Sequence, residues 1–237
     1  LHAAGHAVSD ADATDAAWID LYNPTRDEEL AMESRLGVLL PTREDMAEIE
    51  ASSRLYLEDG VAFMTAQVAF FGGQTHLQSG PVTFVLAGRR LITIRYIDPA
   101  SFSIFAEHID KSPVLCLDGS TAFLNLLDVI IDRTADLIEK IQGSIDDLSR
   151  SIFTRQRKGR LEDVLLLLGN AQNDIVKIRD SLVTFARLTA FAAGLDPALT
   201  AGRHADSKAF QDRLHIMSQD VASLSDHATY VSGNIAF

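Results

Sequence analysis

Threonines and acidic residues recur at a fixed spacing near the N-terminus, and this spacing suggests a defined role for the carboxylates. Thr25 stands three residues before Glu28, and Thr42 stands three residues before Asp45. In a capping box, two side chains at this spacing pair with backbone N–H groups that the first turn of a helix leaves free. Each pair therefore predicts the start of a helix, whose dipole also favours acids in its first turn.

Histidines suggest a second kind of chemistry, because imidazole is a preferred zinc ligand. His204 and His215 are eleven residues apart, which places them on one face of a helix if both are helical. Side chains three turns apart are too far from each other to share one ion, and no cysteine or carboxylate completes a close cluster. We therefore interpret both histidines as solvated, together with His227 beside Asp226.

The charge balance limits the partners that the chain can bind. Its formal net charge is −12, which argues against a nucleic-acid backbone or an anionic membrane surface as partner. The strongest basic run, RQRKGR at 155–160, falls at the predicted turn of a helical hairpin, and we interpret it as a solvated loop. Asp146 and Asp147 lie on a predicted long helix, where exposed acids are usually solvated.

Motifs of enzymes and of secreted or membrane proteins are missing from the sequence. It has no glycine-rich phosphate loop after a strand, no Gly-x-Ser-x-Gly and no His-Glu-x-x-His, so we expect no enzyme. The single cysteine, Cys116, excludes a disulfide within the chain and indicates a reducing compartment, and its apolar surroundings suggest a buried small side chain. No run approaches the roughly 18–20 apolar residues that span a bilayer, so we expect the chain as given to be soluble.

The first half of the chain alternates short elements, which favours an α+β fold with a mainly antiparallel mixed sheet covered by helices. Asn23-Pro24 ends the first strand, and Glu58-Asp59-Gly60 is a hairpin turn signal. Four consecutive strands joined by tight turns predict an antiparallel meander, with the strand that begins at Trp18 at its edge. The predicted elements are a strand at 18–22, helices at 25–36 and from 42, strands at 53–57, 61–71, 82–86 and 91–97, and a short helix at 99–110.

The second half predicts long helices. One helix of about 30 residues begins at Gly119, and another spans 161–193 until Gly194 and Pro197 break it. Apolar residues then alternate at spacings of 4 and 3, at positions 210, 214, 217, 221, 224, 228, 231 and 235. This stripe is typical of a helix in a coiled coil or bundle, and the alternative is a core helix packed only on its two neighbours. No stop signal precedes Phe237, so we expect the helix to continue in a longer protein.

These elements suggest an N-terminal sheet domain at 1–113, a long helical pair at 114–199 and the start of a stalk helix at 200–237. The order of elements, with WIDLYNPT at 18–25 and LITIRY at 91–96, resembles the cytoplasmic domain of CorA-type divalent-cation transporters, including their ZntB branch. The resemblance implies a homopentamer in which the last cytoplasmic helix continues into the first of two membrane helices. It also implies that magnesium bound between neighbouring subunits holds the pore of the CorA branch closed.

The Gly-Met-Asn signature of that family is absent, because it belongs to a membrane helix that the chain lacks. The resemblance therefore implies a fragment without the selectivity filter. In the full-length protein this fragment would lie on the cytoplasmic face of the inner (plasma) membrane, and it would meet the membrane only through the missing C-terminal helices.

The resemblance also implies candidate metal ligands. The family's Glu-Asp-hydrophobic step matches Glu44-Asp45-Met46, and its Phe-x-Asp pattern matches the segment that ends at Asp212. Asp45 and Asp212 would bind a regulatory Mg²⁺ between subunits, with Glu44 and Asp220 as supporting acids just outside the ligand set. Two alternatives stay open: Asp45 closes a capping box, and Asp212 complements a helix dipole. Zn²⁺ is the alternative ion, because the ZntB branch is thought to lack this magnesium site.

Three functions compete at this point. The first is the regulatory domain of a CorA-type magnesium transporter, which senses divalent cations at subunit interfaces and gates the pore. The second is the corresponding domain of a ZntB-like zinc transporter. The third is a soluble coiled-coil adaptor with no role in transport, which accounts for the apolar stripe at 210–235 but not for the capped acidic helix starts. In either transporter, Asp146 and Asp147 would help to concentrate cations near the funnel.

Overall fold

A single mixed sheet forms the centre of the N-terminal half. The computed structural model describes residues 2–3, 6–7, 16–73, 76–153, 161–196 and 207–235. The strand order across the sheet is β2-β1-β3-β7-β6-β5-β4. The strands are β1 (His2–Ala3), β2 (His6–Ala7), β3 (Trp18–Tyr22), β4 (Leu55–Glu58), β5 (Val61–Phe70), β6 (Gln78–Ala87) and β7 (Arg90–Arg95).

The predicted meander is confirmed, since β4 to β7 pair antiparallel in sequence order. β3 lies at the edge of the meander as predicted; its neighbour there is β7, to which it runs parallel, and β1 covers its other side. β6 begins at Gln78 rather than at the predicted residue 82. The strand was predicted to begin directly after Pro81, because proline lacks the N–H group that a strand donates to its neighbour. The proline is tolerated because the described pairing of β6 with β7 begins only at Val82.

Polar side chains buried on one face join β3 to β7, and they explain why the WIDLY and LITIRY segments act together. The Trp18 indole donates to Thr93 Oγ1 at 3.0 Å, and Thr93 donates to Asp20 Oδ1 at 2.7 Å. Arg95 donates to both carboxylate oxygens of Asp20 through Nε and Nη2, at 2.9–3.2 Å. It also donates through Nη1 to Asp98 at 2.8 Å. The two segments are thus tied together over 75 residues of sequence.

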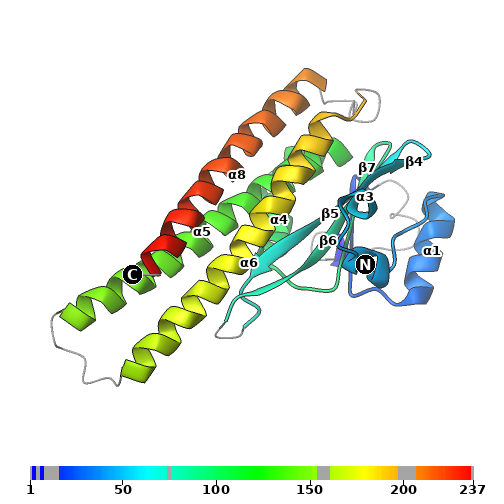
Figure 1. The fold of residues 1–237 in the computed structure, drawn as a ribbon. Helices are drawn as coiled ribbons and strands as arrows, with labels where there is room; N and C mark the ends of the chain where they lie inside the picture. The colour runs from blue at the N-terminus through cyan, green and yellow to red at the C-terminus, as the bar shows by residue number, and fades with distance from the viewer. Residues whose placement is uncertain are drawn as a thin grey trace.

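Helices cover both faces of the sheet, and each face has its own apolar cluster. On one face, Ile19, Phe63 and Val85 pack under Met32 of α1 (Arg26–Leu36) and Met46 of α2 (Arg43–Ala47). The opposite face carries α4 (Ala100–Lys111) and the long helices α5 (Gly119–Phe153), α6 (Leu161–Ala193) and α8 (Ser207–Ile235). The short helix α3 (Ala51–Arg54) lies between α2 and β4, and the short helix η2 (Pro113–Cys116) lies between α4 and α5. Figure 1 shows α1 on the far side of the sheet from the three long helices.

The prediction of long helices is confirmed, and α6 also completes the sheet. β4 pairs with β5 only as far as Met64, which leaves the remaining backbone of β5 open on that side. Thr184 of α6 accepts from the Gln67 backbone N–H at 2.9 Å, and Ser181 donates to the Gln67 carbonyl at 2.6 Å. These side chains replace a neighbouring strand and protect the edge from unwanted pairing.

The apolar stripe at 210–235 faces inward within its own chain. Phe210, Leu214, Met217, Val221, Ala228 and Val231 are all buried in the cluster that includes α5 and α6. The alternative of a core helix packed on its two neighbours is therefore what the structure contains (Figure 1). Because the stripe is covered, it no longer favours a coiled-coil adaptor.

Candidate metal site

Asp45 lies at the start of α2 and closes the predicted capping box. Its Oδ2 accepts from the Thr42 backbone N–H at 2.8 Å and from Thr42 Oγ1 at 2.7 Å. Among the described residues no hydrogen bond reaches its Oδ1, and the side chains of Asp45 and its neighbour Glu44 are exposed. One oxygen of Asp45 therefore caps the helix, and the other is free to meet a cation in solvent.

Two side chains of α2, Met46 and Arg43, hold this helix against the sheet domain. Met46 is buried to 1% exposure, and the guanidinium of Arg43 lies 4.9 Å from the centre of the Tyr96 ring. The Tyr96 hydroxyl donates to the buried Glu29 carboxylate at 2.6 Å. Burial, followed by this hydrogen bond, raises the pKa of Tyr96 above its ordinary value. These contacts fix the direction in which Asp45 faces solvent.

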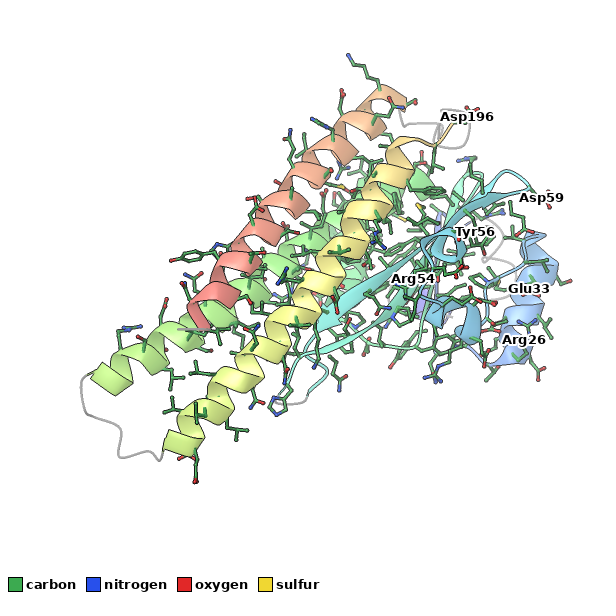
Figure 2. All side chains as sticks on the ribbon, in the orientation of Figure 1. Arg26, Glu33, Arg54, Tyr56, Asp59 and Asp196 are labelled. Carbon is green, nitrogen blue, oxygen red and sulfur yellow. The ribbon has the colours of Figure 1, made fainter. Side chains whose placement is uncertain are left out.

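The same network reaches across α1. Arg26 Nη1 lies 3.0 Å from Glu29 Oε2 and 3.6 Å from Glu33 Oε1. Figure 2 labels Arg26 and Glu33, which both project from α1. Glu33 also accepts from the Leu40 backbone N–H at 3.1 Å, which fastens the connection between α1 and α2. The position of α2, and so of Asp45, thus depends on side chains of α1 and on Tyr96.

Asp212 and Asp220 lie on the outer face of α8. Both side chains are exposed, while Leu214 and Val221 beside them are buried in the bundle. Asp212 follows Phe210 by two residues, and Phe210 stacks against Phe123 of α5 with ring centres 6.2 Å apart. The burial of Phe210 and Leu214 therefore turns Asp212 outward, away from its own chain.

The structure does not bring the predicted ligands together within one chain. Asp45 belongs to α2 on one face of the sheet, and Asp212 belongs to α8 in the bundle on the other face. In the part of the chain that is described, no three His, Cys, Asp or Glu side chains are close enough to hold a metal ion. Their chemistry nevertheless suits Mg²⁺, which takes one or two carboxylates and keeps several waters. A shared ion would have to join two copies of the chain.

An ion pair beside Asp212 was missed from the sequence. Arg213 Nη2 donates to Asp128 Oδ2 and, at 3.0 Å, to Asn125 Oδ1, both on α5. Burial raises the pKa of Asp128, and Asp132 and Asp220 add to the rise, while Arg213 opposes it. Asp128 and Arg213 are 85 residues apart, so no local pattern could have revealed the pair.

The remaining candidates are mostly solvent-facing. His215 is exposed and shares a hydrogen bond with Gln219, and Asp146 and Asp147 are exposed on α5. His227 differs from the prediction, because it is half-buried and its Nε2 lies 2.8 Å from Gln142 Oε1. Cys116 is half-buried, and burial, with a smaller contribution from Asp118, raises the pKa of its thiol to about 11. His204 and the basic run at 155–160 lie outside the described residues.

Comparison with known protein families assigns the chain to one of them. The family model described as "CorA-like Mg2+ transporter protein" matches residues 14–236. The chain belongs to the CorA-like family. The magnesium transport protein CorA of Escherichia coli (strain K12) is 28% identical over 176 residues, which cover 74% of this chain and 56% of that protein. The chain thus spans about half the length of the curated relatives it matches.

Solved structures share the CorA-like fold. The soluble domain of CorA from Methanocaldococcus jannaschii has a TM-score of 0.73 at 13% identity, covering 92% of this chain and 84% of that one. The ZntB cytoplasmic domain from Vibrio parahaemolyticus has a TM-score of 0.61 at 12% identity, covering 92% and 83%. In the described part of the chain, no helix has the length and apolar character that crossing a bilayer requires.

Proposed function

We propose that this chain is the cytoplasmic regulatory domain of a CorA-type magnesium transporter and that it senses divalent cations between subunits. Membership of the CorA-like family and the identity to the magnesium transport protein CorA of E. coli support this proposal. The full-length protein would be a homopentamer, with this domain at the cytoplasmic face of the membrane. The domain itself would catalyse no reaction.

One observation carries the sensing role. Asp45 and Asp212 are both exposed, yet they lie on opposite sides of the sheet, so an ion bound by both must bridge two copies. Carboxylates supplied by two partners, completed by water, suit the hard Mg²⁺ ion. An ion at such an interface stabilises the arrangement of subunits that forms the site. Its loss frees the subunits to rearrange, which is how a ligand biases one of two states.

A ZntB-like zinc transporter is the second candidate. The similarity to the ZntB cytoplasmic domain of V. parahaemolyticus concerns the fold alone, but one local feature suits zinc. Asp212 and His215, which the interpretation of the sequence did not pair, are three residues apart on α8 and both are exposed, so they share one face of the helix. A carboxylate and an imidazole are both common zinc ligands.

Thermal unfolding with Mg²⁺ or Zn²⁺ tests both functions. An ion present at tenfold its Kd stabilises the folded chain by about 1.4 kcal/mol, which raises the Tm by about 3–6 °C for a chain of this size. Because the site spans two copies, the shift should grow with protein concentration. Asp45→Asn and Asp212→Asn should each abolish it. Asp226→Asn, another exposed acid of α8, is the control and should keep it.

Each possible outcome of the titration is decisive. A shift with Mg²⁺ that both variants lose supports the magnesium function. A shift with Zn²⁺ alone, lost in His215→Ala, supports the zinc function. No shift with either ion at millimolar concentration, or a shift that survives both aspartate substitutions, contradicts the proposed sensing role.

A further inference from the structure

Among the interactions described for the residues that the structure places, three polar links join α8 to its neighbours alongside its apolar stripe. At its start, Arg213 binds Asn125 and Asp128 of α5. Further along, His227 pairs with Gln142 of α5 at 2.8 Å. Near its end, Ser232 accepts from Gln172 Nε2 of α6 at 3.1 Å.

The links to α5 share one register. Arg213 and Asp128 are 85 residues apart, and His227 and Gln142 are also 85 residues apart. A constant offset means that α5 and α8 run parallel with one fixed axial alignment. Figure 1 also shows the two helices running in the same direction. Asn125 continues the first link, because its Nδ2 donates to the Leu115 carbonyl at 2.8 Å. The start of α8 is thereby joined through α5 to the η2 segment.

The apolar stripe alone specifies this alignment incompletely. Its buried positions repeat every seven residues, and Leu, Met and Val occupy most of them and exchange places at modest cost, although Phe210 and Ala228 differ from them in volume. A slip of one heptad would keep an apolar seam while moving every residue of α8 by about 10 Å along the axis. Polar residues within such seams are the usual means of specifying register.

We propose that Arg213 is a positioning residue: its bonds to Asp128 and Asn125 fix the axial register of α8, and this register places Asp212 at the height where a neighbouring copy can share a cation. The inference rests on the proposed function for the role of Asp212, but the register itself is independent of any metal. Arg213 and Asp128 are both partly exposed, with side chains 37% and 46% accessible. Breaking an ion pair this exposed should leave the chain folded, which makes the role testable.

Distances between two spin labels, measured by double electron–electron resonance, can test the register directly in the metal-free chain. Spin labels on Ser149→Cys of α5 and Ser223→Cys of α8, in a Cys116→Ser background, mark two exposed serines. From the constant offset, the labelled residues differ by 11 positions along the seam, or about 16 Å of axial distance, so a slip changes their separation. We expect one narrow distance with Arg213 present and a second population in Arg213→Gln.

Two further variants sharpen the test. Arg133→Gln removes an exposed arginine–aspartate pair that stays within α5, and it should keep the single distance. The charge-reversed double variant Asp128→Arg/Arg213→Asp rebuilds the link and should restore it. One unchanged distance in Arg213→Gln, or an equal change in Arg133→Gln, overturns the proposed register.

A magnesium titration of the same proteins tests the positioning role. Arg213→Gln should raise the half-saturating Mg²⁺ concentration about fivefold, at the low end of typical coupling between sites. If the register is lost but this concentration stays unchanged, Arg213 does not position Asp212. If the unsubstituted chain shows no response to Mg²⁺, the proposed function and with it the positioning role fail, while the distances still decide the register.

Discussion

Replacing Asp20 by alanine should destabilise the fold strongly, because Asp20 holds a buried guanidinium. Asp20 is 5% exposed and Arg95 is 7% exposed. The carboxylate accepts from Arg95 Nε and Nη2 and from Thr93 Oγ1, all within 3.2 Å. The guanidinium of Arg95 also lies between the Tyr22 and Phe102 rings, 4.2 and 4.4 Å from their centres. Alanine would leave that charge buried with much of its compensation removed.

The structure also bounds the size of the effect. Removing one partner of a buried ion pair typically costs about 3–5 kcal/mol. We expect about 3 kcal/mol, at the low end of that range, because Arg95 keeps Asp98 and the Ile97 carbonyl, both at 2.8 Å. For a chain of this length, the loss lowers the Tm by about 6–12 °C. Urea unfolding followed by circular dichroism measures the free energy directly.

Two comparisons make this prediction refutable. Asp136→Ala removes a partner of Arg133 from an exposed pair on α5, and it should cost under about 0.5 kcal/mol. Replacing both Asp20 and Arg95 by leucine and methionine should recover most of the stability, because no buried charge then remains. The reasoning is wrong if Asp20→Ala costs no more than Asp136→Ala.

Tyr96, Gly119 and Asp45 each occupy a position where one substitution should change the stability of the chain by a measurable amount. The raised pKa of Tyr96 means that the unfolded chain loses this proton first, so unfolding free energy should fall above about pH 10, by up to about 1.4 kcal/mol per pH unit. Tyr96→Phe should remove that part of the slope in urea titrations, and equal slopes would contradict it. Gly119→Ala should cost about 3 kcal/mol in thermal melts, since its Cβ would lie 2.3 Å from a backbone carbon of β7. Gly143→Ala, in open space within α5, should instead stabilise by about 0.5–1 kcal/mol, and equal effects would refute the packing argument. Asp45→Ala should cost about 1 kcal/mol by opening the capping box, whereas Asp45→Asn keeps an acceptor and should cost less. An equal loss of unfolding free energy in both variants would contradict this view of the cap.

Local signals predicted most of the fold. Thr25 and Glu28 form the expected capping box, and the glycine that ends α1, Gly37, has a left-handed φ of 67°. The bounds of α6 agree with the pattern read from residues 161–193, because apolar periodicity and a Gly-Pro break are both local features. The parallel pairing of β3 with β7 joins segments about 75 residues apart, and local patterns carry no information on such a contact.

The candidate site was only partly predictable, for the same reason. The capping role of Asp45 followed from its distance to Thr42, and the structure contains both hydrogen bonds. The metal role came from family resemblance alone and stays a prediction. The Arg213–Asp128 pair could not be foreseen, since it requires the helix packing that sets two residues of α5 and α8 side by side.

The central claim is that one cation is shared by Asp45 of one copy and Asp212 of a neighbour. Mixing the Asp45→Asn chain with the Asp212→Asn chain tests it by calorimetric Mg²⁺ titration. Each variant alone should bind no regulatory Mg²⁺. In an equimolar mixture of a head-to-tail ring, about a quarter of the interfaces unite the two intact carboxylates and should bind again. A mixture that binds no more Mg²⁺ than either variant alone contradicts the shared site.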